Sequence, residues 1–246
     1  MNYKISVITT LYNCEKFVKE SFDSIINQSF KDFEWIVVND GSTDNTWDIA
    51  TSYKNDNIVF VNNADNKRIP TRRNEAISYA SSPYIAIHDG DDISLPDRLL
   101  KQYEFMESCD DKTFCVGGWA LQIDENSKEQ RVMNYPPCKH KEVVNMLLIE
   151  RKNPIIDPTS MFKRDIFIKL GEYSLDKEIY TVPDMDLWSR AIINGYKINN
   201  ISDILIKYRI NPKGMTRMFN KEMQKAHNFV WNDFKIKMFK NSNTRG

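Results

Sequence analysis

Residues 6–46 read SVITTLYNCEKFVKESFDSIINQSFKDFEWIVVNDGSTDNT, and this stretch decides the fold. It contains two short runs rich in Val and Ile, at residues 5–10 and 33–39, which are typical of buried strands. Between these runs, apolar residues recur at the spacing of one helical face, and Asn13 is the expected N-cap of that helix. The order strand, helix, strand predicts two parallel strands joined by a helical crossover.

The same alternation continues along the first half of the chain. Further strands are expected at residues 58–62 and 84–88, with helices at residues 44–52 and 71–80. Such repetition predicts an α/β fold in which helices cover both faces of a mainly parallel sheet. The second half is less regular, with strands expected at residues 114–123, 159–162 and 204–208 and helices at residues 95–108, 141–149, 165–170, 184–194 and 221–240.

Three of the expected strands end in acidic or hydrogen-bonding residues. Thr10 and Tyr12 end the first strand, Asp40 ends the second, and Asp89-Gly90-Asp91-Asp92 follows the fourth. In open parallel sheets, ligands bind beyond the carboxyl ends of the strands. We therefore expect a nucleotide and a metal ion along this edge of the sheet.

Length and composition set broad limits on the kind of protein. With 246 residues, 41% of them apolar, the chain suits one large domain or one domain with an extension. Lys+Arg and Asp+Glu are equal at 34 each, so overall charge predicts neither nucleic-acid nor membrane binding. The four cysteines form no C-x-x-C pair, and no segment approaches the ~18 apolar residues of a membrane span. A cytoplasmic protein with free thiols is expected.

The acidic cluster at residues 89–92 has two interpretations when it is considered alone. Three carboxylates in four residues repel one another, and a divalent cation such as Mn²⁺ or Mg²⁺ relieves that repulsion. An acidic turn whose Asp92 or Ser94 caps the following helix explains the same residues without a metal. For an isolated motif the turn is the commoner case.

The neighbouring motifs favour the metal site. Besides residues 6–46, the chain carries Arg73-Asn74-Glu75-Ala76, the run SPYIAIHDGDD at residues 82–92, and Asp184-Met185-Asp186-Leu187-Trp188. Together these closely resemble family 2 glycosyltransferases, which are inverting enzymes with a GT-A fold. The resemblance implies a catalytic domain at residues 1–218, followed by an amphipathic helix and tail at residues 219–246. It also divides that domain into a nucleotide-sugar-binding half at residues 1–100 and an acceptor-binding half at residues 101–218.

The resemblance also implies roles for individual residues. Thr10, Tyr12 and Asp40 line the base and ribose pocket, and Arg73 lies near the nucleotide or diphosphate. Asp91 is the direct ligand of a divalent metal, Mn²⁺ or Mg²⁺, while Asp89 contacts the ribose or reaches the metal through water. Each role has a plainer alternative: Asp40 lies in a good β-turn sequence, and Arg73 belongs to a run of surface-compatible arginines.

Asp184 matches the second acid of the family's acidic-acidic-x-Asp-Leu-Trp pattern, although Pro183 replaces the first. The resemblance implies that Asp184 is the general base, and capping of its helix is the alternative. A carboxylate with an ordinary pKa near ~4 is a weak base. A second departure is Tyr208-Arg209-Ile210-Asn211, where many relatives carry Tyr-Arg-x-His. Residues 211–219 after it are either a lid over the donor or a plain surface loop.

The resulting expectation is an inverting transferase that moves a sugar from a nucleotide-sugar donor, expected to be a UDP-sugar, to a saccharide or glycolipid hydroxyl. Bacterial surface polysaccharide synthesis is the setting that the resemblance implies, with no nucleic-acid partner. A sugar-nucleotide nucleotidyltransferase and a non-catalytic binding protein of the same fold are the alternatives. The basic, aromatic segment from Lys221 to Lys240 either touches the inner face of the membrane or packs on the domain.

Overall fold

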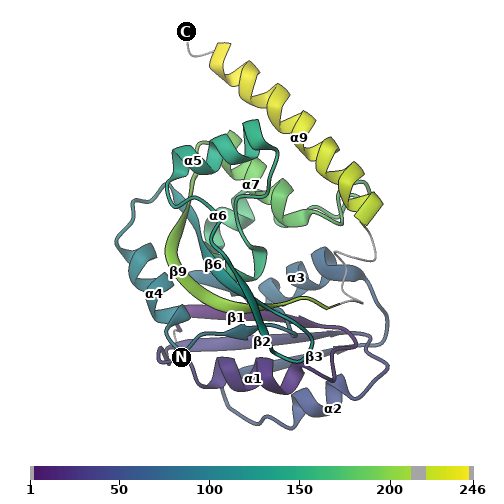
Figure 1. Cartoon of the computed structure of the whole chain (residues 1–246). Helices are drawn as coiled ribbons and strands as arrows, with labels where there is room; N and C mark the ends of the chain where they lie inside the picture. Colours follow the sequence, from purple (N-terminus) through teal and green to yellow (C-terminus); the bar gives the residue numbers. More distant parts are fainter. Residues whose placement is uncertain (1–2, 212–219, 244–246) are drawn as a thin grey trace.

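A computed structural model describes residues 3–211 and 220–243 (Figure 1). Strands and helices alternate through the first half as predicted. The elements there are β1 (Ile5–Leu11), α1 (Val18–Ile26), β2 (Phe33–Asp40), α2 (Thr46–Thr51), β3 (Ile58–Asn63), α3 (Arg68–Ser78) and β4 (Tyr84–Ile87). Four strands run parallel in the order β3-β2-β1-β4, so that Ile5 lies beside both Phe33 and Tyr84. The buried runs of the sequence therefore became the centre of the sheet.

The second half extends the same sheet with both antiparallel and parallel pairs of strands. Its elements are β5 (Ile93–Ser94), α4 (Arg98–Glu107), β6 (Thr113–Ile123), β7 (Glu129–Met133), α5 (His140–Asn145), a π-helical turn η1 (Met146–Glu150), a 3-10 turn η2 (Asp157–Thr159), β8 (Met161–Lys163), α6 (Arg164–Lys169), α7 (Pro183–Ile193), β9 (Lys197–Arg209) and α9 (Asn220–Asn243). Among the described residues the order is β3-β2-β1-β4-β8-β6-β9-β5, with β7 paired to β6.

The expected α/β GT-A architecture is confirmed, although only its first half is purely parallel. β8 pairs antiparallel with both β4 and β6, whereas β6 and β9 are parallel. The short strands β5 and β7 were not predicted, and β9 begins at Lys197 instead of residue 204. The helix expected at residues 141–149 is α5 followed by the π-helical turn η1.

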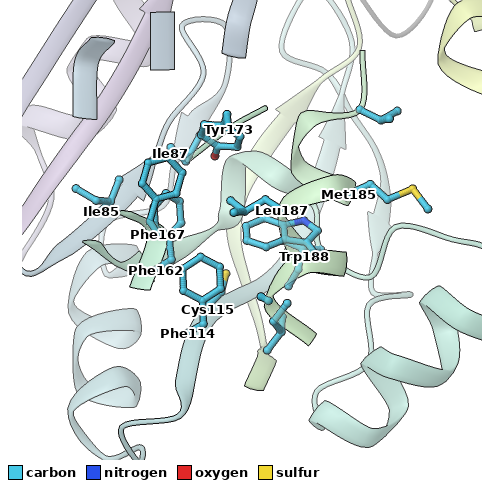
Figure 2. Close-up of a cluster of buried hydrophobic side chains, with 14 of the residues drawn as sticks. Ile85, Ile87, Phe114, Cys115, Phe162, Phe167, Tyr173, Met185, Leu187 and Trp188 are labelled. Carbon is cyan, nitrogen blue, oxygen red and sulfur yellow. The ribbon is translucent and has the colours of Figure 1, made fainter. Parts of the chain in front are cut away.

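Helices cover both faces of the sheet and bury two apolar clusters. On β1, Val7 belongs to the cluster beneath α1, and Ile8 belongs to the cluster beneath α3 and α7. This alternation is expected because successive side chains of a strand point to opposite faces. Figure 2 shows the second cluster, where Trp188 of α7 lies 6.1 Å from Phe114 and 6.5 Å from Phe162, ring centre to ring centre.

The C-terminal helix α9 packs on this second cluster through one face. Its inward residues Ala226, Val230, Trp231 and Phe234 are buried, and the Trp231 indole N–H donates to the Leu148 carbonyl at 3.0 Å. Packing on the domain is thus the observed arrangement for this part of the helix. In the described part of the chain, no helix is long and apolar enough to cross a membrane. The expected boundary at residues 218 and 219 lies outside the described residues.

The prediction that Asn13 caps α1 is wrong. The N-cap position is Phe17, and Asn13 stands four residues earlier with a positive φ of 46°. Its side-chain oxygen accepts the Thr43 N–H at 2.8 Å, and its own N–H donates to the Ser42 hydroxyl at 3.1 Å. Asn13 therefore adopts the left-handed conformation of a turn, which its short polar side chain tolerates. Its hydrogen bonds connect the loop after β1 to the loop after β2.

Candidate active site

The carboxyl ends of β1, β2 and β4 meet at one edge, as the sequence predicts. Thr10 near the end of β1 is half-buried, and Tyr12 just beyond it is 52% exposed. Asp40 is the buried last residue of β2, and Asp89 follows β4 with its side chain 30% exposed. Because β1 lies between β2 and β4, one ligand at this edge can reach all three strand ends.

Asp40 holds the start of α3. Its Oδ1 accepts the Lys67 N–H and the Arg72 Nε–H, both at 2.7 Å, and its Oδ2 accepts the Arg68 N–H at 3.1 Å. A carboxylate has about four acceptor positions, so Oδ2 keeps room for one more donor. Arg72, which sequence analysis treated as a neighbour of Arg73 without a role, is the buried cation of this pair.

Arg73 is enclosed between two carboxylates. One guanidinium nitrogen donates to Asp157 Oδ2 at 2.5 Å and the other to Asp89 Oδ1 at 2.9 Å, and the Tyr173 ring centre lies 5.7 Å away. Burial alone lowers the pKa of Arg73, but Asp157 and Asp89 outweigh it and raise that pKa well above its ordinary value. The side chain is therefore a fixed cation near the carboxyl ends of β1, β2 and β4.

Sequence analysis missed Asp157. It lies in the turn η2, and Asp157-Pro158-Thr159 reads locally as an ordinary turn. Its partner Arg73 stands 84 residues earlier, so no local signal reveals the pair. Burial, together with Asp184 and Asp89, raises the pKa of Asp157 to about 7, although Arg73 lowers it. Asp89, Arg73, Asp157 and Asp184 thus form one electrostatic cluster.

The acidic turn itself is packed tightly against the loop after β1. A Cβ added to Gly90 would lie 2.5 Å from Leu11 Cδ2 and 3.2 Å from the Cys14 sulfur, so space, more than backbone freedom, requires glycine. Burial, followed by the nearby charge of Asp89, raises the pKa of Asp91 to about 6. Asp89 is paired with Arg73, and the cation of Arg209 partly offsets the rise in the Asp91 pKa.

Arg209 at the end of β9 holds the turn from the other side. Its N–H donates to Asp92 Oδ1 at 2.8 Å, its Nε–H donates to the Asp91 carbonyl at 2.7 Å, and its other arm pairs with Glu20 at 2.7 Å. Asp92 is 1% exposed, and burial raises its pKa well above the ordinary value. These contacts agree with the structural role that we expected for Asp92. Residues 212–219 of the proposed lid lie outside the described residues.

His88 precedes the turn as a packed, fully buried residue. Its ring nitrogens contact the hydroxyls of Ser21 at 2.8 Å and Ser94 at 3.1 Å. Burial, reinforced by the cation of Arg98, lowers the pKa of His88 to about 3. The imidazole is therefore neutral and belongs to the support beneath the site.

Asp184 lies in the first turn of α7. Pro183 is the first helical residue and Val182 the N-cap, so Asp184 is not the cap, although its carboxylate accepts the Met185 N–H. Asn153 donates to its Oδ2. Burial is the largest influence on the Asp184 pKa and raises it, so this carboxylate is a stronger base than its ordinary value suggested.

The rest of α7 serves the structure. Asp186, on the opposite face of the helix from Asp184, pairs with Arg190 at 2.7 Å, and Trp188 lies in the core. These two residues therefore orient and pack the helix. Trp119 is half-buried and donates its indole N–H to the Pro136 carbonyl at 3.3 Å.

Comparisons with known proteins agree with the fold and identify the family. Residues 6–171 match the family described as Glycosyl transferase family 2. An uncharacterized glycosyltransferase of Methanocaldococcus jannaschii is 37% identical over 84% of this chain and 70% of its own length. The O-antigen biosynthesis glycosyltransferase WbnJ of Escherichia coli is 34% identical over 85% of this chain and 80% of its own. The chain belongs to glycosyltransferase family 2.

It is accordingly a glycosyltransferase, as predicted, and this family membership removes the nucleotidyltransferase alternative. Solved structures confirm the GT-A fold. TarS of S. aureus in complex with UDP-GlcNAc superposes with a TM-score of 0.69 at 19% identity, over 96% of this chain and 73% of that one. The mannosyltransferase PcManGT from Pyrobaculum calidifontis, in complex with GDP-Man and Mn²⁺, superposes with a TM-score of 0.66 at 15% identity. The superposition covers 99% of this chain and 76% of that one.

Proposed function

We propose that this glycosyltransferase moves a sugar from a UDP-sugar to a hydroxyl of a saccharide or glycolipid, with inversion and with Asp184 as general base. The observation that carries the proposal is the clustering of Asp184 with Asp157, Arg73 and Asp89 at the carboxyl edge of the sheet. Asp89 comes from the donor end of β4, while Asp184 comes from α7 in the second half. Donor and acceptor chemistry therefore meet in one electrostatic cluster.

Asp184 has the properties that the base requires. Its carboxylate is oriented by Asn153 and by the Met185 N–H, and burial raises its pKa. In the proposed step, Asp184 takes the proton of an acceptor hydroxyl while that oxygen bonds to the anomeric carbon. The bond from this carbon to the diphosphate oxygen breaks at the same time, and the nucleoside diphosphate leaves from the opposite side. A single displacement of this kind inverts the anomeric configuration.

The carboxylates suit a divalent metal, Mn²⁺ or Mg²⁺. Within residues 3–211 and 220–243, no group of three or more His, Cys, Asp or Glu side chains is arranged to hold a metal. Mg²⁺-type sites often use only one or two carboxylates and take further ligands from substrate phosphates. Asp91, crowded by Asp89 and raised in pKa, fits as the direct ligand, with Asp89 beside it. The bound ion would supply positive charge to the leaving diphosphate.

The remaining donor contacts follow the strand ends. We propose that Thr10 and Tyr12 line the nucleotide pocket and that Asp40 accepts a base N–H at its free acceptor position. Arg73 acts behind this pocket, held by its two carboxylates. Residues 1–100 then form the donor half, residues 101–218 the acceptor half, and residues 219–246 an extension.

The biological setting is proposed from the relatives. WbnJ is named for O-antigen biosynthesis, which supports a role in bacterial surface polysaccharide assembly. We expect a cytoplasmic enzyme that approaches the inner face of the membrane to meet its acceptor. Phe229, Ile236 and Phe239 of α9 are half exposed or more, beside several lysines, which supports peripheral contact through residues 221–240.

The deciding experiment is metal-dependent release of UDP from a panel of UDP-sugars, with GDP- and dTDP-sugars as alternatives. Asp184→Asn should lower transfer by about 10²–10⁴-fold, the usual contribution of a general base. UDP binding by the same variant should change little. Asp186→Asn is the matched control on the other face of α7. Normal transfer by Asp184→Asn with a competent donor and acceptor would show that the base assignment is wrong.

A further inference from the structure

The guanidinium of Arg73 connects the first half of the chain to the second, because it pairs with Asp89 and with Asp157. Its side chain is 2% exposed and is held from three directions, by Asp89 after β4, Asp157 in η2 and the ring of Tyr173. Asn74, the next residue of α3, exchanges two hydrogen bonds with the Tyr173 backbone, at 2.8 and 3.0 Å. Arg73 therefore has a single orientation, and each end of its guanidinium faces a different carboxylate.

Asp157 is paired through only one of its oxygens. Oδ2 accepts from Arg73, but Oδ1 is buried and has no hydrogen-bond partner among the described residues. A buried, unpaired carboxylate oxygen destabilises a protein, and such groups are uncommon unless they serve a function. The neighbouring residue Thr159 is fully bonded, through Gly118 and Ile156, so the turn does not need Asp157 to hold its shape.

Loss of the Asp157 charge would change what Arg73 does to Asp89. The guanidinium nitrogen that faces residue 157 would keep at most a neutral acceptor there and lose its charge-assisted hydrogen bond. Arg73 would then be drawn toward Asp89, the remaining carboxylate. The Asp89 carboxylate would change its orientation at the donor edge as a result.

We propose that Asp157 is a positioning residue for sugar transfer, which fixes Arg73 and through it sets the orientation of Asp89 at the donor site. The proposal rests on the proposed function, because Asp89 matters in this way only if the donor and metal bind beside it. It assigns a role to a residue of the second half in donor binding, outside the donor half at residues 1–100.

The test compares the full-length wild type with Asp157→Asn, Asp157→Glu and Asp186→Asn. The probe is Mn²⁺ with UDP, measured by titration calorimetry and by the electron spin resonance of bound Mn²⁺. Substitution of a residue that orients a metal ligand costs about 10- to 100-fold in affinity or activity, and Asp157→Asn should lose that much. Asp157→Glu, which keeps the charge, should recover part of it. Asp186→Asn removes a carboxylate with similar exposure, 16% against 19%, and should remain within twofold.

A crystal structure of Asp157→Asn decides the proposal even if Mn²⁺ and UDP prove to be the wrong probe. In that structure we expect Arg73 to rotate and Asp89 to change its carboxylate orientation. If the wild type binds neither Mn²⁺–UDP nor any other nucleotide, the proposed function fails, while the position of Arg73 still tests Asp157. If Arg73 and Asp89 keep their wild-type positions, or if Asp157→Asn binds Mn²⁺–UDP as the wild type does, the positioning role is refuted.

Discussion

Replacement of His88 by Gln should remove part of the acid sensitivity of this fold. His88 is fully buried and neutral, with hydroxyl partners at both ring nitrogens and the cation of Arg98 nearby. Its pKa of about 3 in the folded protein lies far below the value of about 6.5 for an exposed histidine. The unfolded chain therefore binds a proton at pH values where the folded chain does not.

The sign and size of the effect follow from this difference. Since the folded pKa is depressed, His88 contributes its full stability above about pH 6.5 and loses it as pH falls toward 3. Each pH unit in that window changes the free energy of unfolding by about 1.4 kcal/mol for one proton. Between pH 7 and pH 4.5 the loss attributable to His88 should be about 2–3 kcal/mol.

Urea unfolding of wild type and His88→Gln at pH 4.5, 5.5, 6.5 and 7.5 measures this directly. His140 and His227 also have lowered pKa values because of burial, so both proteins will lose stability in acid. The effect of His88 is the difference in free energy of unfolding between wild type and His88→Gln. This difference should shrink by about 2–3 kcal/mol between pH 7.5 and pH 4.5. A difference that stays constant with pH would show that His88 titrates normally in the folded protein and would refute the reasoning.

Three further predictions concern packing and the acidic turn. Gly90→Ala should cost about 1–3 kcal/mol in urea unfolding because its Cβ meets Leu11, and Leu11→Val should reduce that cost; equal costs in both backgrounds would contradict this. Phe234→Ala should cost about 3–5 kcal/mol if α9 packs as observed, and a loss under about 1 kcal/mol would mean that α9 does not share the core. Arg209→Lys should lower the melting temperature and Mn²⁺ affinity together, since a lysine cannot bridge Asp91 and Glu20; an unchanged Mn²⁺ affinity would separate Arg209 from the metal turn.

The fold was predictable where burial leaves a local pattern. The parallel strands β1, β2 and β4 are continuous apolar runs because both of their faces are covered. β7 has no such pattern because four of its five residues are exposed, and β5 has only two residues. Asn13 was misassigned because the same side chain suits an N-cap and a left-handed turn, and only the tertiary contact with Thr43 decides between them.

In the candidate site, too, residues in local motifs were predictable, whereas residues defined by tertiary contacts were not. Resemblance predicts site roles for Asp89, Asp91 and Asp184; in the structure Asp89 pairs with Arg73, and the charge of Arg73 also acts on Asp184. Asp157 escaped notice because its partner is distant in sequence and its own neighbours form an ordinary turn. The raised pKa of Asp184 could not be predicted from the sequence either, because it results from burial in the folded chain.

The antiparallel pairing of β4 with β8 has a consequence for protein engineering. Ile85 of the first half of the chain lies directly beside Phe162 of the second half, so one continuous hydrogen-bonded sheet carries both. A chimera that exchanges whole halves between relatives would have to rebuild that pairing, together with the Phe162 packing, at its junction. An exchange confined to segments outside the sheet would leave that pairing intact.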